Sequence, residues 1–356
     1  MSAGELNPLA SDLDGVLDAA GEDLRTLHGA RLFITGGTGF VGSWLLESLL
    51  WANELYGLDA TAVVLTRDPD GFARRMPHLA ANQALSFVQG DVVDFDVPDG
   101  PFTHVIHAAA ESSTRQNELK PLRMIDTVVQ GTRNVLDAAR SWDAASVLFV
   151  STGAVYGIQP TDVEHLPEEW AGGPDPLSPS SAYAEAKRLG EQLCAIHSRD
   201  GMNVKIARCF AFVGPYLPLD AHFAIGNFIR DGLAGGPIRV RGDGTPVRSY
   251  LYAADLAAWL WAILARGRAG RAYNVGSEDA RTIAETAAVV AEAFAPPPVV
   301  QMLGDASFGR GGRYVPSTGR ARSELGVAET VTLADAVSRT VAWHRSGPGV
   351  GRPPTD

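Results

Sequence analysis

The chain is poor in the features that mark secreted, zinc-bound and membrane proteins. Its 356 residues contain two cysteines, Cys194 and Cys209, which are too few for a disulfide framework or a cysteine zinc site. The longest apolar run, residues 256–265, is about half of the ~20 residues that a membrane-spanning helix needs. The N-terminal segment lacks the basic start and apolar centre of a signal peptide. We therefore expect a soluble protein of the reducing cytoplasm.

A surplus of basic residues is also missing. The formal net charge is −11, and a surface of that sign repels phosphate backbones and anionic lipids. The eight histidines show no spacing typical of metal ligands. Composition therefore argues against nucleic-acid binding, membrane binding and a metal site, while the 46% of hydrophobic residues is typical of a packed globular chain.

Short apolar segments alternate with helical stretches from residue 31 onward. Because these segments are apolar almost throughout, they resemble strands buried on both faces of a sheet. Strand–helix alternation predicts an α/β fold with a doubly wound parallel sheet, the Rossmann arrangement. The expected strands are 31–35, 61–66, 85–88, 104–107, 146–151 and 203–208, and the expected helices between them are 42–55, 124–139 and 181–198.

The second half of the chain is punctuated by proline, glycine and aspartate, which predicts a smaller C-terminal substrate-binding lobe beyond the strand ends. Helices are expected there near 222–234, 253–266 and 279–295. The predicted division is an N-terminal extension over 1–29, a dinucleotide-binding Rossmann domain over 30–215 with contributions from about 248–276, a lobe over 216–247 and 277–346, and a flexible tail over 347–356.

A glycine-rich segment directly follows the first predicted strand and opens a helix. Gly36, Gly39 and Gly42 allow a tight turn, close approach of backbone to a pyrophosphate, and helix–strand packing. Phe40 and Val41 would supply amide donors at the positive end of the helix dipole. A glycine pattern alone is weak, but the strand before it and the helix after it favour dinucleotide binding.

The end of the second strand bears on the type of cofactor. An acidic side chain there would bind the adenosine ribose of NAD, but the chain has Arg67 followed by Asp68. Arg67 either pairs with the 2′-phosphate of NADP or is a solvated strand end. We expect NAD or NADP, with a slight preference for NADP.

Two further strand ends contain candidate cofactor contacts. Asp91, followed by Val92, comes after the third strand and can accept a hydrogen bond from the adenine amino group. Ala108 and Ala109 end the fourth strand, where small side chains let backbone approach the cofactor or merely pack. Given the glycine segment, we favour the cofactor interpretation for both places.

Tyr183 and Lys187 lie four residues apart, on one face of a predicted helix. The lysine ammonium and the nicotinamide charge can lower the pKa of the phenol, so that it exchanges a proton with a substrate hydroxyl or carbonyl. Thr152, at the end of the fifth strand, can hydrogen-bond the same reacting oxygen. We predict these three as the catalytic residues.

With these motifs in place, the chain resembles the extended short-chain dehydrogenase/reductases, in the NAD-dependent epimerase/dehydratase family that modifies nucleotide sugars. The similarity covers roughly residues 30–345 and includes segments 208–215, 242–250 and 255–257. It implies that Arg248 contacts the diphosphate of a nucleotide sugar and that Asn227 contacts the substrate, together with Thr152 and Tyr183. It also implies that Tyr183 deprotonates a sugar hydroxyl, usually at C4, as hydride passes to the nicotinamide.

Departures from the family pattern discriminate among its branches. Sugar 4,6-dehydratases of the family have an Asp-Glu pair directly after the threonine, where this chain has Gly153 and Ala154. The related decarboxylases have a glutamate matching Ala154. Glu111, after the fourth strand, is nevertheless similar to the dehydratase branch, and Ala211 replaces a family asparagine near the substrate.

These observations favour a nucleotide-sugar epimerase that works through transient oxidation. A ketoreductase or dehydrogenase acting on a nucleotide-linked sugar comes second, followed by a dehydratase with relocated acid/base groups. A dinucleotide-sensing protein without turnover comes last, because a sensor needs no phenol beside a lysine. The resemblance also implies a homodimer formed through the helices at 124–139 and 181–198.

Overall fold

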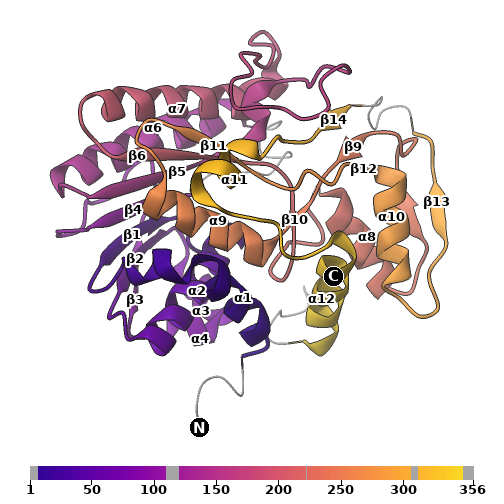
Figure 1. Cartoon of the computed structure of the whole chain (residues 1–356), viewed down its shortest axis with the longest axis horizontal. Coiled ribbons are helices and arrows are strands. Elements are labelled where there is room, and N and C mark those ends of the chain that lie inside the picture. Colours follow the sequence, from indigo (N-terminus) through magenta and orange to yellow (C-terminus); the bar gives the residue numbers. More distant parts are fainter. Residues whose placement is uncertain (1–6, 110–119, 222, 306–311, 348–356) are drawn as a thin grey trace.

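The centre of the molecule is a seven-stranded parallel sheet in the order β11-β6-β5-β4-β1-β2-β3 (Figure 1). The computed structural model describes residues 7–109, 120–221, 223–305 and 312–347. This strand order, which changes direction beside β1, confirms the predicted Rossmann arrangement. The strands are β1 (Arg31–Thr35), β2 (Thr61–Thr66), β3 (Leu85–Gln89), β4 (His104–His107), β5 (Ser146–Thr152), β6 (Val204–Cys209) and β11 (Ala272–Val275).

Apolar sequence explains why this sheet is covered on both faces. Every residue of β5 is buried, as expected of a central parallel strand. Helices α6 (Pro121–Ser141) and α7 (Ala182–Arg199) cover one face, while α2 (Phe40–Tyr56) and α9 (Ala253–Arg266) cover the other. The predicted strands and helices are therefore present, with ends that differ by up to four residues, and β11 adds a strand that the sequence alone did not indicate.

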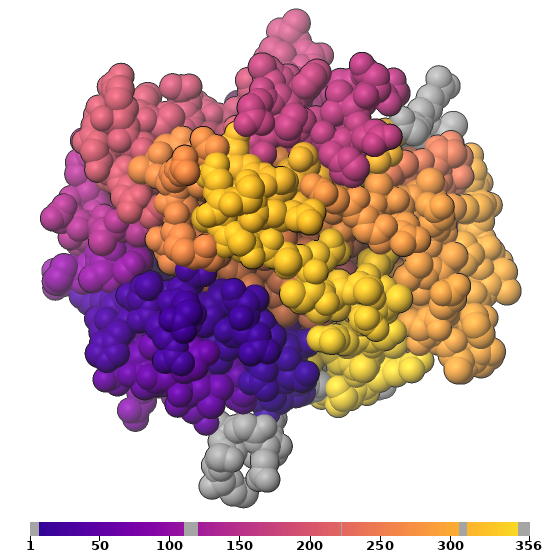
Figure 2. Space-filling model, in the orientation of Figure 1, coloured from indigo at the N-terminus to yellow at the C-terminus, as the bar shows by residue number. Residues whose placement is uncertain are grey.

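The N-terminal extension forms helix α1 (Ala10–Arg25), which packs over α2 and α9 as an additional layer. The Asp12 carboxylate accepts a hydrogen bond from the Tyr252 hydroxyl at 2.7 Å and pairs with Arg339 at 2.5 Å. Arg339 belongs to α12 (Leu333–Ser346), so α1 joins the Rossmann helices to the C-terminal helix. Figure 2 shows the N-terminal and C-terminal segments side by side on the surface.

The remaining segments form a smaller unit around the carboxyl end of the sheet, with short strands and three helices (Figure 1). Its helices are α8 (Ala224–Leu233), α10 (Ile283–Glu292) and α12. Its strands pair as β10 (Leu251–Tyr252) with β7 (Phe212–Val213), β13 (Val300–Met302) with β8 (Ile238–Val240), and β12 (Arg281–Thr282) and β14 (Arg313–Tyr314) on either side of β9 (Val247–Arg248). Short helices complete the fold: α3 (Pro69–Arg75), α4 (Pro77–Ala80), η2 (Gly153–Tyr156), η3 (Pro179–Ser181) and α11 (Gly319–Leu325).

Two negative findings hold for the part of the chain that the structure describes. No helix there is both long and apolar enough to cross a membrane. No group of three or more His, Cys, Asp or Glu side chains there could hold a metal ion. Glu111 and the tail beyond residue 347 lie outside the described residues.

Candidate active site

The glycine segment forms a tight turn between β1 and α2. Gly36 has φ +72°, and a Cβ there would lie 2.5 Å from the carbonyl carbon of Ala108. A Cβ on Gly42 would lie 2.3 Å from Gly37 Cα, so both positions exclude any side chain. The turn therefore packs directly against the backbone of Ala108 and Ala109, where small side chains were predicted to allow a close approach.

The first turn of α2 can receive an anion. Its N-cap is Gly39, which provides no side-chain hydrogen bond to the helix. The amides of Phe40, Val41 and Gly42 lie before the first intrahelical bond, which runs from Ser43 N to Gly39 O at 2.8 Å. Free amide donors and the positive end of the helix dipole fit the pyrophosphate of a dinucleotide.

The ends of β2 and β3 contain the polar residues expected near the adenosine. Arg67 is exposed, while Asp68 accepts a hydrogen bond from Gly71 N at 2.8 Å and so caps α3. Asp91 is partly exposed, with one oxygen 3.2 Å from Val93 N and the other 3.9 Å from Arg123. Val92 is buried against α6. Asp68 is thus engaged in a helix cap, whereas Arg67 and Asp91 both reach solvent at the carboxyl edge of the sheet.

Lys187 is buried with its ammonium group at the carboxyl half of β5. Only 1% of the residue is exposed, and its Nζ donates to Val150 O at 2.7 Å and lies 4.6 Å from the centre of the Phe149 ring. Burial lowers its pKa to about 8. The ammonium group is therefore still charged at neutral pH, inside the protein and one helical turn from Tyr183.

Tyr183 lies in the first turn of α7 and shares Thr152 with a second phenol. Burial raises the pKa of Tyr183 to about 12, and a hydrogen bond with Thr152 opposes that rise. Burial also raises the pKa of Tyr314, and Thr152 again opposes the rise, so the two phenols lie near the same hydroxyl. The structure therefore brings Thr152, Tyr183 and Lys187 together, as predicted, and adds Tyr314.

Tyr314 fills the space over Gly153. A Cβ on Gly153 would lie 2.6 Å from the Tyr314 hydroxyl and 2.7 Å from Phe210, whose ring centre is 4.6 Å from that of Tyr314. No signal in the sequence indicates Tyr314, because it belongs to a two-residue strand more than 150 positions after Thr152. Only the pairing of β14 with β9, which sets Tyr314 opposite Arg248, brings it to the site.

The two predicted substrate residues have different surroundings. Arg248 is partly exposed, and its guanidinium donates to Val247 O at 2.8 Å and Gly312 O at 2.9 Å. Its positive charge opposes the rise in the pKa of Tyr314, which lies opposite it in the β9–β14 pair. Asn227 is on α8, bonded to Ala221 O and Arg230. Among the described residues, Asn227 makes no hydrogen bond to Thr152, Tyr183 or Lys187.

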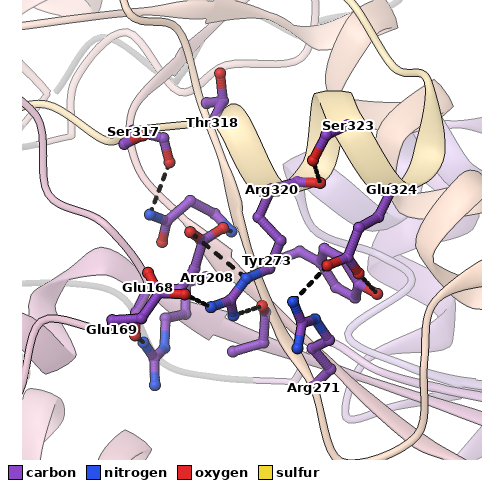
Figure 3. A network of polar contacts seen from close by, with 12 residues as sticks. Glu168, Glu169, Arg208, Arg271, Tyr273, Ser317, Thr318, Arg320, Ser323 and Glu324 are labelled. Atoms are coloured by element: carbon purple, nitrogen blue, oxygen red, sulfur yellow. Dashed lines mark hydrogen bonds and ion pairs between the residues drawn. The ribbon is translucent and has the colours of Figure 1, made fainter.

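A network of ion pairs supports the back of the site. Arg208 on β6 forms a partly buried pair with Glu191 on α7 at 2.7 Å, and Glu191 also accepts a hydrogen bond from Ser151 at 2.6 Å. Arg208 further donates to Glu168 O at 3.2 Å. Figure 3 shows the network continuing through Arg320, which reaches Glu168 and Glu169, toward the Arg271–Glu324 pair. These contacts join the loop after β5, which contains Glu168 and Glu169, to β6 and α7.

Known proteins provide an independent comparison. A model of the NAD-dependent epimerase/dehydratase family matches residues 32–276. The chain is 34% identical to dTDP-glucose 4,6-dehydratase from Streptomyces griseus, over 89% of this chain and 95% of that one. It is 30% identical to UDP-glucuronic acid decarboxylase 1 from Arabidopsis thaliana, over 89% and 70% respectively. The crystal structure of the dTDP-glucose 4,6-dehydratase DesIV from Streptomyces venezuelae, with NAD bound, is 29% identical, with a TM-score of 0.74 over 89% of this chain and 97% of that one.

Proposed function

The chain belongs to the NAD-dependent epimerase/dehydratase family, and from that premise we propose that it is a nucleotide-sugar epimerase. In this proposal a sugar hydroxyl, at C4, is oxidised to a ketone, and the ketone is then reduced from its other face. NAD is the cofactor of the family, and the preference for NADP drawn from Arg67 stays a prediction without support from the relatives.

The observation that supports an epimerase over a dehydratase is the filled space at Gly153. Dehydratases resembling this chain have an Asp-Glu pair where it has Gly153 and Ala154, and they use that pair for deprotonation at C5 and loss of water at C6. Neither residue here can transfer a proton, and the Tyr314 hydroxyl and Phe210 ring leave no room for a side chain at position 153. Epimerisation needs only the groups that are present.

The chain's own residues would perform the proton chemistry as follows. When bound, NAD supplies a hydride acceptor and a positive charge next to the phenol. Tyr183 removes the proton of the sugar hydroxyl, and Thr152 hydrogen-bonds the same oxygen. The Lys187 ammonium favours the phenolate, since an opposite charge nearby lowers the pKa of a phenol. Burial raises the pKa of Tyr183 to about 12, and the positive charges of Lys187 and of bound NAD would lower it again.

Binding roles follow the same layout. We assign the pyrophosphate to Gly36 and Gly39 and to the amides of Phe40, Val41 and Gly42. The adenosine would lie near Arg67, Asp91 and Val92, and the nicotinamide half near Ala108, Ala109, Tyr183 and Lys187. Arg248 would bind the diphosphate of the substrate, because a guanidinium suits phosphate geometry, and Asn227 would contact the nucleotide sugar.

A homodimer through α6 and α7 and a cytoplasmic location also remain predictions.

A ketoreductase is the second candidate, because it needs the same three catalytic residues and only one hydride transfer. Two measurements separate it from an epimerase. Mass spectrometry of the nucleotide released on denaturing freshly purified protein should identify retained NAD. Incubation with UDP-glucose or dTDP-glucose should then give the C4 epimer without added NADH or NADPH, and Tyr183→Phe should abolish it. Protein that emerges empty and consumes NADPH with a keto sugar would instead indicate a ketoreductase.

A further inference from the structure

His107 is a buried histidine at the end of β4 that the proposed chemistry does not use. It is 2% exposed, and both ring nitrogens have a hydroxyl partner. Nδ1 lies 2.7 Å from Thr35 Oγ1 at the end of β1, and Nε2 lies 3.1 Å from Thr132 Oγ1 on α6. The ring therefore joins the sheet edge that contacts the cofactor to a covering helix.

The partners of the two hydroxyls fix where the ring proton is. Thr132 donates its only hydroxyl proton to Val128 O at 2.6 Å, so toward His107 it can only accept. Nε2 must then be protonated. Nδ1 is left as an acceptor, and it receives the hydroxyl proton of Thr35. Thr35 Oγ1 in turn accepts the amide proton of Ala109 at 3.2 Å.

This chain of hydrogen bonds ends at the backbone that forms one wall of the dinucleotide cleft. A Cβ on Gly36 would lie 2.5 Å from Ala108 C and 2.6 Å from Ala109 N, so the glycine turn rests on this same backbone. Thr35 is the last residue of β1 and Gly36 follows it directly. A shift of the Ala109 amide would therefore move the backbone that the glycine turn contacts. The start of α2 would move with the turn.

We infer that neutral His107, protonated on Nε2, is a positioning residue that fixes the end of β4 against the glycine turn and so sets the affinity for NAD. A charged imidazolium would have two donors facing Thr35 and Thr132. Thr35 Oγ1 would then accept from both Nδ1 and the Ala109 amide, and its own hydroxyl proton would lose the ring nitrogen as its acceptor. Burial lowers the pKa of His107 to about 3, with a further contribution from the Lys187 charge, which agrees with the neutral form.

The first test is spectroscopic and does not depend on turnover. Protein labelled with ¹⁵N-histidine should show one ring with a protonated Nε2 and an unprotonated Nδ1 that does not titrate between pH 5 and pH 8. That pair of signals should vanish in His107→Asn, which assigns it. A signal pair showing protonated Nδ1, or a ring that titrates near pH 6.5, would overturn the inference.

The second test measures the Kd for NAD by calorimetry on protein freed of nucleotide. His107→Leu removes both hydrogen bonds and should weaken NAD binding on the order of tenfold or more. His107→Asn can keep an acceptor toward Thr35 and should recover part of the affinity, while Thr132→Val should fall between wild type and His107→Leu.

A matched control is available on the same strand. His104 begins β4, is partly buried and bonds to Thr103 Oγ1 at 2.9 Å, at the opposite end of the sheet from the cleft. His104→Leu should lower the Tm and leave the Kd for NAD unchanged. Equal loss of NAD affinity in His104→Leu and His107→Leu, or none in either, would contradict a positioning role. Because NAD binding is common to every reaction of the family, these outcomes do not depend on whether the enzyme is an epimerase.

Discussion

Two lysines, each 1% exposed, lie at opposite ends of the central sheet and show what separates a reactive site from a structural one. Burial lowers the pKa of both Lys187 and Lys205 to about 8. Lys205 is near the amino end of β6, where its Nζ donates to Ser146 Oγ at 2.6 Å and to Leu264 O at 3.1 Å. Leu264 is in the last turn of α9, where a cation is favourable.

The partners of the two ammonium groups differ. Lys187 lies at the carboxyl half of β5, and among the described residues its ammonium group donates to one oxygen, that of Val150. One helical turn away is Tyr183, with Thr152 beyond it. A buried charge is thus no sign of catalysis in itself. The two lysines differ in place and in partners: the Lys187 ammonium lies at the carboxyl half of β5, one helical turn from Tyr183, whereas that of Lys205 donates to two oxygens that join β5 and α9 at the amino edge.

The largest expected effect follows from replacing each lysine by methionine. Lys187→Met should lower kcat by about 10²- to 10⁴-fold, since the phenol loses the cation that favours its ionised form. Lys205→Met should leave kcat within about twofold at temperatures where it is folded. Steady-state assays at matched folded fractions, checked by circular dichroism, test this contrast. Equal losses in both variants would mean that the lysines act through stability alone.

A second contrast separates two neighbouring hydroxyls on β5. Thr152→Val should lower kcat by about 10- to 10²-fold, because the reacting oxygen loses a hydrogen-bond donor inside the site. Ser151→Ala removes the hydroxyl that bonds Glu191 on the opposite side of the same strand end. It should cost about 1 kcal/mol of stability and leave kcat nearly unchanged. A larger loss of activity for Ser151→Ala than for Thr152→Val would reverse the roles.

The buried ammonium of Lys187 also makes stability depend on pH. Its pKa is about 8 in the folded protein and about 10.5 when unfolded, so between these values the unfolded chain binds more protons. The free energy of unfolding should therefore rise with pH across that window, by up to roughly 3 kcal/mol from this residue. Urea unfolding of the wild type and Lys187→Met from pH 7.5 to 10.5 should show a stability difference that shifts in favour of the wild type. If the free energies of unfolding of the two proteins change in parallel with pH, this prediction is wrong.

The smallest expected effect is at the amino edge. Ser146→Ala removes one of the two oxygens that accept from Lys205 and leaves a buried donor with one partner. It should lower the free energy of unfolding by about 1–2 kcal/mol, with kcat and the Kd for NAD unchanged. Thermal unfolding combined with the epimerase assay measures both. A change in kcat would show that the two edges of the sheet are coupled.

The sequence predicts the carboxyl edge well because its signals are local. Glycine spacing after a strand and the four-residue spacing of Tyr183 and Lys187 each report short-range geometry. The structure packs the glycine turn against Ala108 and places Tyr183 beside Thr152. The amino edge carries no comparable signal. Lys205 is a single charged residue in an apolar strand. Its burial is explained only by its hydrogen bonds to Ser146 and Leu264, which the sequence does not predict.

Long-range contacts account for what the sequence does not predict. Tyr314 reaches Gly153 through the pairing of β14 with β9, and Asp12 in α1 meets Tyr252 and Arg339 more than 200 residues away. Neither contact follows from periodicity or from a motif. The same holds for His107, whose tautomer depends on hydroxyls from β1 and α6.

The most direct test of the proposed function is analysis of the product formed from UDP-glucose or dTDP-glucose in D₂O. Epimerisation through a C4 ketone returns the same hydride, so NMR and mass spectrometry should show the C4 epimer without solvent deuterium in the sugar. A 4-keto-6-deoxy sugar that has gained deuterium would contradict the account, because it requires the C5 deprotonation for which positions 153 and 154 offer no base.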